Sequence, residues 1–316
     1  MLKENSQGIR QQILPILAAD IAEALERRNT DFDGLQEIRL RTEKPMVIIE
    51  GGKEIFVTDS KNNRLTVTGK EIRETLDYIS NYSLYAYENE LRQGFITIEG
   101  GHRVGMAGQT VLEQNKVKNM KYISSVNIRI SHEIKGCAGR VMPYISKNGE
   151  LCHTMIISPP RCGKTTLLRD IVRQASDGCR WVKGTTVGVV DERSEIGGCY
   201  RGEPQNDLGI RTDILDCCPK AEGMLMLIRS MAPRILAVDE IGAKEDVSAI
   251  EYALHCGCIM LATAHGSSVE ELRKKPLFDD LIENRRFERY VVLSNKKSTG
   301  GVEGIYDEKG MPLCKS

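Results

Sequence analysis

A stretch near the middle of the chain, residues 158–170 (SPPRCGKTTLLRD), carries residue types suited to binding a nucleotide phosphate. Gly163 lets the backbone wrap phosphate oxygens, Lys164 supplies a positive charge, and Thr165 supplies a hydroxyl for Mg²⁺. The stretch follows a predicted buried strand at 153–158 and opens a predicted helix at 163–176, the setting that this motif requires. The pattern predicts an ATP phosphate loop made of Ser158, Pro159, Pro160, Arg161, Cys162, Gly163, Lys164, Thr165 and Thr166.

The first position of this loop departs from the usual pattern G-x-x-x-x-G-K-[ST], because Ser158 stands where glycine is common. A serine fits at this bend if its φ is negative, and the two prolines that follow stiffen the loop. The change leaves Lys164 and Thr165 untouched. We therefore expect a working nucleotide site.

Acidic residues and a histidine close three further apolar runs. Asp239 and Glu240 follow RILAV, Asp191 and Glu192 follow VGVV, and His265 follows IMLATA. Since the carboxyl ends of parallel strands meet at one edge of a sheet, these side chains are expected in one cleft with the phosphate loop. There Asp239 can hold Mg²⁺ through water, and Glu240 can orient or deprotonate the attacking water.

The elements that must position these residues alternate between strand and helix from residue 151 to 316. Alternation of this kind predicts a mostly parallel sheet covered on both faces, here an α/β RecA-like P-loop NTPase core. Predicted strands lie at 153–158, 185–192, 234–240 and 258–266, and predicted helices at 163–176, 221–232 and 243–257. The tail after Tyr290 reads as a hairpin.

The first part of the chain, residues 1–132, has the pattern of a smaller α+β domain. Residues 9–28 have helical periodicity that Pro15 should break or kink, and packing on the domain is favoured over a membrane-surface role because of the acids in this helix. Strands are predicted at 37–42 and 45–58, a helix at 69–91, a hairpin at 94–113 and a further strand at 116–131. Residues 133–150 read as a junction with a short helix.

Composition limits the remaining function classes. The 316 residues contain 44 Lys and Arg against 44 Asp and Glu, and neither predicted domain is basic, which disfavours nucleic-acid binding. The 10 cysteines include no C-x-x-C pair, so buried thiols are favoured over a zinc site. With no run of 18 apolar residues and no signal peptide, a cytoplasmic protein is expected.

GTP is the less suitable nucleotide. Asn295 and Lys296 resemble the start of the guanine-binding signature, but the aspartate that should follow is missing. ATP is therefore favoured.

The order of phosphate loop, acidic box, IRSMAPRILAVDEIG and HCGCIMLATAHGSS resembles the ATPases of type II and type IV secretion and pilus systems. By this resemblance Asp191 and Glu192 match the acidic box and His265 the His box, while Arg229 and Arg234 match an arginine-rich helix. The chain departs from the family at Ser158, and also at Asp239 and Gly242, where secretion ATPases have Gly and Arg.

The resemblance also implies partners. Residues 101–131 are similar to the hairpin-rich amino-terminal domain of the family, in which arginines reach the nucleotide of a neighbouring subunit, and Arg103 and Arg129 are the matching positions. A homohexameric ring with Mg²⁺ and ATP is implied. More narrowly, the chain resembles secretion-type ATPases of endospore-forming bacteria, which implies a mother-cell protein that works with membrane proteins of a sporulation channel to the forespore.

Two other functions stay open at this level. A nucleic-acid-stimulated ATPase would share the core, with KVKNMK as a strand-binding loop. An assembly scaffold that binds ATP with little hydrolysis is the function that Ser158 would favour.

Overall fold

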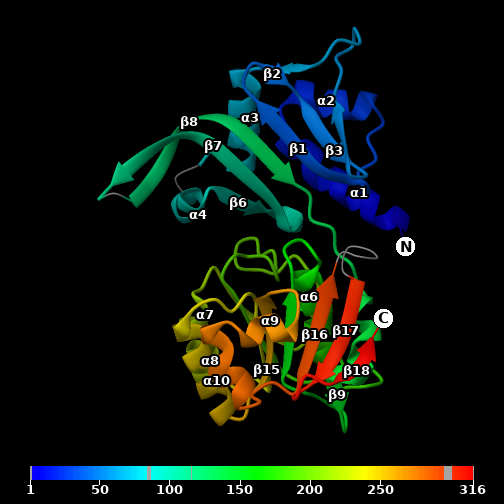
Figure 1. Ribbon diagram of the computed structural model, residues 1–316. Helices are drawn as coiled ribbons and strands as arrows, with labels where there is room; N and C mark the ends of the chain where they lie inside the picture. Colours follow the sequence, from blue (N-terminus) through cyan, green and yellow to red (C-terminus); the bar gives the residue numbers. More distant parts are fainter. Residues whose placement is uncertain (1, 84–86, 115, 295–300, 316) are drawn as a thin grey trace. The chain divides into compact units, whose positions relative to one another are not determined.

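The computed structural model describes residues 2–83, 87–114, 116–294 and 301–315. The chain divides into two compact units, Met1–His132 and Glu133–Ser316. These are unit 1 and unit 2, respectively. Each unit has its own sheet (Figure 1). Each also buries its own apolar side chains, in one cluster in the first unit and in two in the second.

Unit 1 is built on a six-stranded antiparallel sheet in the order β4-β3-β1-β8-β7-β6. A two-stranded ribbon of β2 and β5 accompanies it. The strands are β1 (Leu35–Arg41), β2 (Lys44–Pro45), β3 (Val47–Glu50), β4 (Lys53–Phe56), β5 (Thr66–Val67), β6 (Phe95–Ile98), β7 (His102–Glu113) and β8 (Lys116–Arg129).

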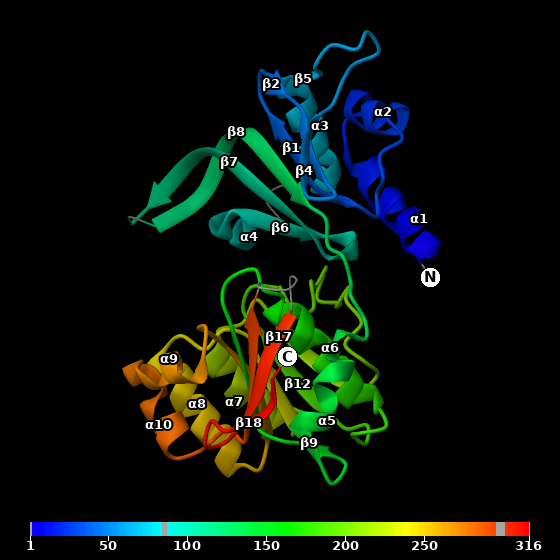
Figure 2. The same cartoon turned by 45° about the vertical axis from the view of Figure 1, so that its right-hand side comes forward.

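The helices of unit 1 cover one face of this sheet (Figure 2). They are α1 (Leu2–Ile13), η1 (Leu14–Ile16), α2 (Ala19–Arg27), α3 (Gly69–Ile79), α4 (Glu88–Gln93) and η3 (Glu99–Gly101). Side chains such as Ile13, Ile21 and Ile72 meet Ile38 and Ile128 from the strands in one core. Because successive strand residues point to opposite faces, the residues between these apolar ones form the other face of the sheet.

The predicted break in the first helix is confirmed, since Pro15 lies in the 3-10 helix η1 between α1 and α2. The helix predicted over 69–91 is instead two helices, α3 and α4. The start of α3 has a full capping box, in which Thr68 and Glu71 each accept a backbone N–H of the other, and this fixes its first turn.

Unit 2 contains an eight-stranded sheet in the order β13-β12-β14-β15-β11-β16-β17-β18. The first six strands run parallel, and β17 and β18 add an antiparallel edge. The strands are β11 (Thr154–Ser158), β12 (Val187–Asp191), β13 (Thr212–Asp216), β14 (Ile235–Val238), β15 (Ile259–His265), β16 (Arg289–Ser294), β17 (Gly301–Asp307) and β18 (Pro312–Lys315). The mostly parallel α/β sheet predicted from the sequence is confirmed.

Helices cover both faces of this sheet. They are α6 (Lys164–Asp177), α7 (Lys220–Ser230), α8 (Lys244–His255), α9 (Val269–Arg273), η5 (Pro276–Phe278) and α10 (Asp279–Glu283). Ile156 of β11 packs with α6 in one core, and its neighbours Met155 and Ile157 pack with α7 and α8 in another. Every residue of β11 is buried, as expected for a strand between two layers.

Residues 133–150, expected as a junction, contain η4 (Cys137–Arg140), α5 (Met142–Ile145), β9 (Ser146–Lys147) and the start of β10 (Glu150–Leu151). Ala138, Val141 and Met142 are part of the core around α6. This segment is therefore packed structure of unit 2. In the tail, β16 and β17 pair as predicted, while the turn with Asn295 and Lys296 lies outside the described residues.

All ten cysteines lie in described residues, and none forms a disulfide. Cys258 is buried, as expected. Cys217 and Cys256 are exposed, so for these two positions the interpretation as buried thiols is wrong. Among the described residues no group of three or more His, Cys, Asp and Glu side chains is placed to hold a metal ion.

Candidate nucleotide-binding site

The phosphate loop joins the end of β11 to the first residue of α6. Arg161 has φ +59° and Gly163 has φ +80°, so the chain turns twice through the left-handed region before Lys164 begins the helix. This brings backbone N–H groups and the positive end of the α6 dipole to one point, the arrangement that binds phosphate. Cys162 is only 1% exposed and packs in the core, so this residue offers its backbone alone.

Ser158 is the last residue of β11 and is fully buried. It pairs with His265 of β15, and its hydroxyl donates to the carbonyl oxygen of Pro159 at 2.7 Å. The extended backbone of a strand has negative φ, so the bend needs no glycine here. Its side chain is bound to the local backbone.

Four side chains from two elements meet beside the loop. Lys164 Nζ lies 2.9 Å from Glu240 Oε2 and 3.9 Å from Asp239 Oδ1. The hydroxyl of Thr165 donates to Asp239 Oδ2 at 2.8 Å. The cation and hydroxyl at the start of α6 are thus held against the two acids that follow β14, as the strand-end argument predicted.

Thr263 of β15 supports both acids. Its hydroxyl donates to Asp239 Oδ1 and accepts the backbone N–H of Glu240 at 2.8 Å. Each carboxylate oxygen of Asp239 therefore accepts a hydrogen bond from one hydroxyl group, that of Thr165 or that of Thr263. Hard oxygen donors of this kind suit Mg²⁺, which keeps several waters when it binds to protein.

Glu240 has an uncommon backbone conformation, with φ +49°. A non-glycine residue in this region is strained by about 1–3 kcal/mol and persists where its surroundings hold it. The hydrogen bond from Lys164 lowers the pKa of Glu240, with further help from the charges of Arg193 and His265. Glu240 is therefore ionised at neutral pH and able to accept a proton.

Asp191 is used inside its own loop. Its carboxylate accepts the backbone N–H groups of Glu195, Ile196 and Gly197 at 2.8–2.9 Å, and the residue is 1% exposed. Burial raises the pKa of Asp191 to about 6, although these three donors act in the opposite direction. Arg169 of α6 also donates to the carbonyl oxygen of Ile196. Asp191 thus shapes the loop after β12.

Glu192 lies beside the acids of β14 in a cavity of about 220 Å³. It forms an ion pair with Lys220, the first residue of α7. The cavity lining also includes Asp239, Glu240 and Arg193. Glu192 is therefore next to the phosphate loop partners but is held by a different lysine.

His265 ends β15, the strand next to β11, and its side chain is exposed. It is close enough to Glu240 for its charge to affect that carboxyl. Arg234, in contrast, precedes β14 and pairs with Glu150, so it lies at the amino edge of the sheet, away from this site.

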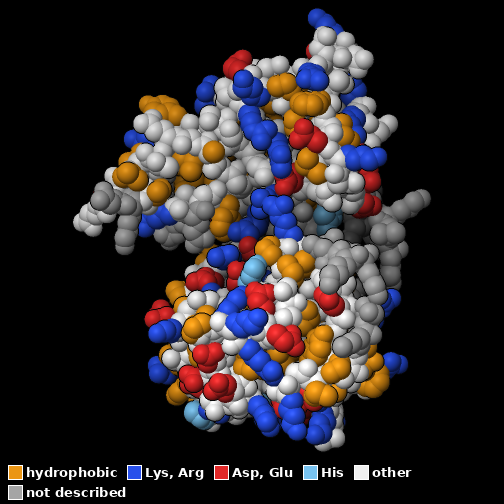
Figure 3. Space-filling view, viewed as in Figure 1, with side chains coloured by type: hydrophobic (Ala, Val, Ile, Leu, Met, Phe, Trp, Pro, Cys, Tyr) orange, Lys and Arg blue, Asp and Glu red, His pale blue; other side chains and the backbone are white. Residues whose placement is uncertain are grey.

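Arg103 and Arg129 belong to unit 1, where they are direct cross-strand partners on β7 and β8. Figure 3 shows Lys and Arg side chains gathered over this part of unit 1. Arg103 lies on the ring of Phe95, 3.8 Å from its centroid, and Arg129 is 3.7 Å from Glu37. The two residues carried over by family resemblance thus form one cluster.

Three residues of the site, Thr263, Lys220 and Arg169, are not among those predicted from the sequence motifs. Thr263 had a readable signal, since it is a polar residue inside the apolar run IMLATAHG two positions before His265. Lys220 and Arg169 had none, because each acts through a partner that only the fold brings near.

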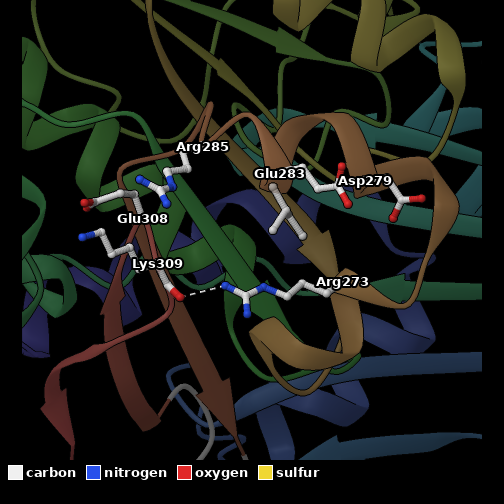
Figure 4. Close-up of a pocket in the computed structure, with 7 residues that line it drawn as sticks. Arg273, Asp279, Glu283, Arg285, Glu308 and Lys309 are labelled. Carbon is white, nitrogen blue, oxygen red and sulfur yellow. Dashed lines mark hydrogen bonds between the residues drawn. The ribbon is translucent and has the colours of Figure 1, made fainter.

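Figure 4 shows a second cavity of unit 2, of about 380 Å³, and its lining lies near the amino-terminal end of β16. The turn after β17 forms part of it, and Asp307 at that turn pairs with Arg289, the first residue of β16. Its lining carries charges of both signs, from Arg273, Arg285, Lys309, Asp279, Glu283 and Glu308. None of the motif residues lines it.

Solved structures define the class of fold. The ATPase DotB of Legionella pneumophila is 16% identical and superimposes with a TM-score of 0.57, over 86% of this chain and 74% of that one. The pilus retraction motor PilT with bound ADP is 14% identical, with a TM-score of 0.58 over 89% and 77%. The chain has the fold of the secretion ATPases, a RecA-like core preceded by an amino-terminal domain.

The family follows from the sequence. The model of the family "Sporulation stage III, protein AA" matches residues 7–313, so this chain belongs to that family. Stage III sporulation protein AA of Bacillus subtilis (strain 168) is 44% identical over 89% of this chain and 90% of its own length. Among the described residues no helix is both long and apolar enough to cross a membrane.

Proposed function

We propose that this protein is a Mg²⁺-dependent ATPase that drives or assembles a sporulation channel between mother cell and forespore. One observation carries the proposal. Lys164 and Thr165 at the start of α6 lie within hydrogen-bond distance of Glu240 and Asp239 after β14. This is the set of groups that phosphoryl transfer from ATP requires.

Each residue of the site has a chemical task. The N–H groups of residues 161–165 and the ammonium of Lys164 bind phosphate oxygens, while Thr165 and Asp239 would hold Mg²⁺, the latter through water. Bound Mg²⁺ would neutralise charge on the phosphates. Glu240 orients the attacking water and accepts its proton as an ionised carboxylate, and the hydrogen bond from Lys164, which lowers its pKa, makes it a weaker base until phosphate draws that lysine away.

The remaining candidates act around this centre. Asp191 holds the loop that carries Glu192, Arg193 and Glu195 in shape. Glu192, whose partner is Lys220, tunes the charge of the cavity. His265 lies at the strand end next to the phosphate loop, where it can contact the outermost phosphate.

We propose that Arg103 and Arg129 complete the site of an adjacent subunit in a homohexameric ring. Charge balance supports this, because the described lining of the 220 Å³ cavity contains six acids against two cations, Arg193 and Lys220. An arginine supplied by a neighbour is worth ~10³–10⁵ in rate. We propose that the ring works in the mother cell at a membrane complex, and membership of a stage III sporulation family supports this setting.

The proposal is tested by measuring phosphate release from ATP with purified wild type and with Lys164→Ala. Loss of the ammonium is expected to reduce turnover at least about 100-fold, the size seen when a group that stabilises transition-state charge is removed. Lys147→Ala removes an exposed lysine from β9, at a distance from the loop, and should change nothing.

The ring is tested by measuring the ATPase rate over a series of protein concentrations. The rate per subunit should fall as the protein is diluted to monomers, because the neighbour's arginines are then lost. A high rate that stays flat on dilution contradicts the ring. ATP binding without phosphate release would leave an assembly scaffold, and a rate that depends on added DNA would favour a nucleic-acid-stimulated motor.

A further inference from the structure

A row of side chains crosses four strands of unit 1 on the face opposite its helices. Glu37 of β1 pairs with Arg129 of β8, Arg129 with Arg103 of β7, and Arg103 with Thr97 of β6. Their strand neighbours, such as Ile38 and Ile128, point into the core. The row therefore lies on the open face of the sheet.

Two like charges stand directly opposite each other in this row. Cross-strand partners have Cβ atoms about 5 Å apart, and like charges in this position destabilise a sheet. Arg103 is stabilised by stacking on Phe95. Arg129 has a side chain that is 61% exposed, so its guanidinium depends on a charge partner for a fixed direction.

That partner is Glu37, and Glu37 is itself held in place. Arg39 donates to Glu37 Oε2 through Nε at 2.8 Å, and its Nη2 lies 2.7 Å from the same oxygen. This leaves Oε1 on the side of Arg129, 3.7 Å from Nε. The carboxylate side chain is only 21% exposed, so water screens these contacts less than on an open surface.

We propose that Glu37, fixed by Arg39, is the positioning residue that aims Arg129 at the nucleotide phosphates of the adjacent subunit. The contact engages Nε, the inner nitrogen of the guanidinium, and directs the outer Nη groups toward a ligand. A planar fork aimed in this way binds phosphate with two parallel hydrogen bonds. The inference rests on the proposed function of Arg129 and adds the residues that make it effective.

The test mixes two inactive variants in one ring. Lys164→Ala has no working phosphate loop but keeps the arginine row intact. Arg129→Ala keeps a working phosphate loop but lacks the arginine that would be donated to its neighbour. Mixed rings should hydrolyse ATP at the Arg129→Ala sites whose neighbours donate Arg129. The donor is then replaced by the double variant Glu37→Gln with Lys164→Ala.

With this donor the recovered kcat should fall about tenfold or more, the order of effect seen when an outer-shell partner is removed, with KM for ATP nearly unchanged. Glu37→Asp should restore part of the rate. The matched control is Glu54→Gln in the donor, since Glu54 belongs to the same row two strands away, through Ile49. This control removes the same charge and should recover the full rate.

Each outcome is decisive. Equal recovery with the Glu37→Gln and Glu54→Gln donors overturns the positioning role and leaves the arginine donation intact. No recovery with the unmodified donor overturns donation by Arg129, and the positioning role with it. If Glu37→Gln does not assemble, as judged by gel filtration and thermal melting, Arg39→Lys serves instead, because it keeps the charge and loses the Nε contact. A fall in recovered kcat with that donor supports the role, and an unchanged rate overturns it.

Discussion

The two units display their charged groups in different ways. In unit 2 the acids and the lysine sit at the ends of parallel strands, each within a short run of sequence next to a buried strand. In unit 1 the charges belong to three strands, β1, β7 and β8, and meet only through antiparallel register. A site of the first kind leaves a motif in the sequence, and a site of the second kind leaves isolated charges.

The difference also affects how each site keeps its geometry. In unit 2 the backbone aims the groups, as the positive φ of Glu240 and the N–H donors around Asp191 show. In unit 1 side chains aim one another, from Arg39 to Glu37 to Arg129. Single substitutions should therefore act locally in unit 2 and through neighbours in unit 1.

The largest expected effect is on kcat, and it shows which acid of unit 2 serves as the general base for ATP hydrolysis. Glu240→Gln should keep ATP binding and lower kcat about 10²–10⁴-fold, the range for loss of a general base. Glu192→Gln should lower it less than about tenfold, because Glu192 is held by Lys220 and is not the partner of Lys164. Single-turnover hydrolysis with the two variants compares them directly. A dead Glu192→Gln beside an active Glu240→Gln would move the base to the loop after β12.

The site in unit 2 was largely predictable for a physical reason. Lys164, Thr165, Asp239 and Glu240 each follow or precede a strand that the apolar pattern locates, and parallel strands share one edge. The use of Asp191 inside its own loop was not predictable, because the donors come from residues 195–197, whose turn has no periodic pattern. The row in unit 1 needs strand register, which single-sequence periodicity does not provide.

The helices and strands were likewise predictable only where the sequence pattern is strong. Strands buried on both faces, such as β11, were placed correctly from apolar runs. The strand β13 was missed because its residues are only partly buried and carry Asp213 and Asp216 among the apolar ones. The helices α9 and α10 were missed because five residues each are too few to show a helical period.

An effect of intermediate size is expected in the pH dependence of folding stability, which should differ between the two units. Burial, together with the nearby charge of His132, lowers the pKa of His102 in unit 1 to about 4 from the usual 6.5. Folded unit 1 thus binds fewer protons than the unfolded chain between these values. Its stability is fully present above pH 6.5 and falls by about 3 kcal/mol as the pH drops toward 4. Asp191 in unit 2 has the opposite sign, because its raised pKa favours the folded state as the pH falls through 6.

The measurement follows both units in the intact chain. Hydrogen exchange of Val104 and Ile128 amides reports unit 1, and fluorescence of Trp181, the single tryptophan, reports unit 2. His102→Gln should remove most of the pH dependence of unit 1 and leave that of unit 2 unchanged. Equal pH dependence of unit 1 in wild type and variant would rule out His102 as its source.

The smallest expected effect is at Ser158, where unit 2 departs from the usual loop. Ser158→Gly should change kcat by less than about twofold, because the hydroxyl is bound to the carbonyl oxygen of Pro159 and the strand backbone already permits the turn. Stability should fall by about 1–2 kcal/mol, from the lost hydrogen bond and the added freedom of glycine. Ser158→Ala separates the two terms, since it removes the hydroxyl alone. Phosphate release and thermal melting of both variants measure this, and a tenfold gain in rate with glycine would mean that Ser158 restrains a loop whose backbone otherwise suffices for hydrolysis.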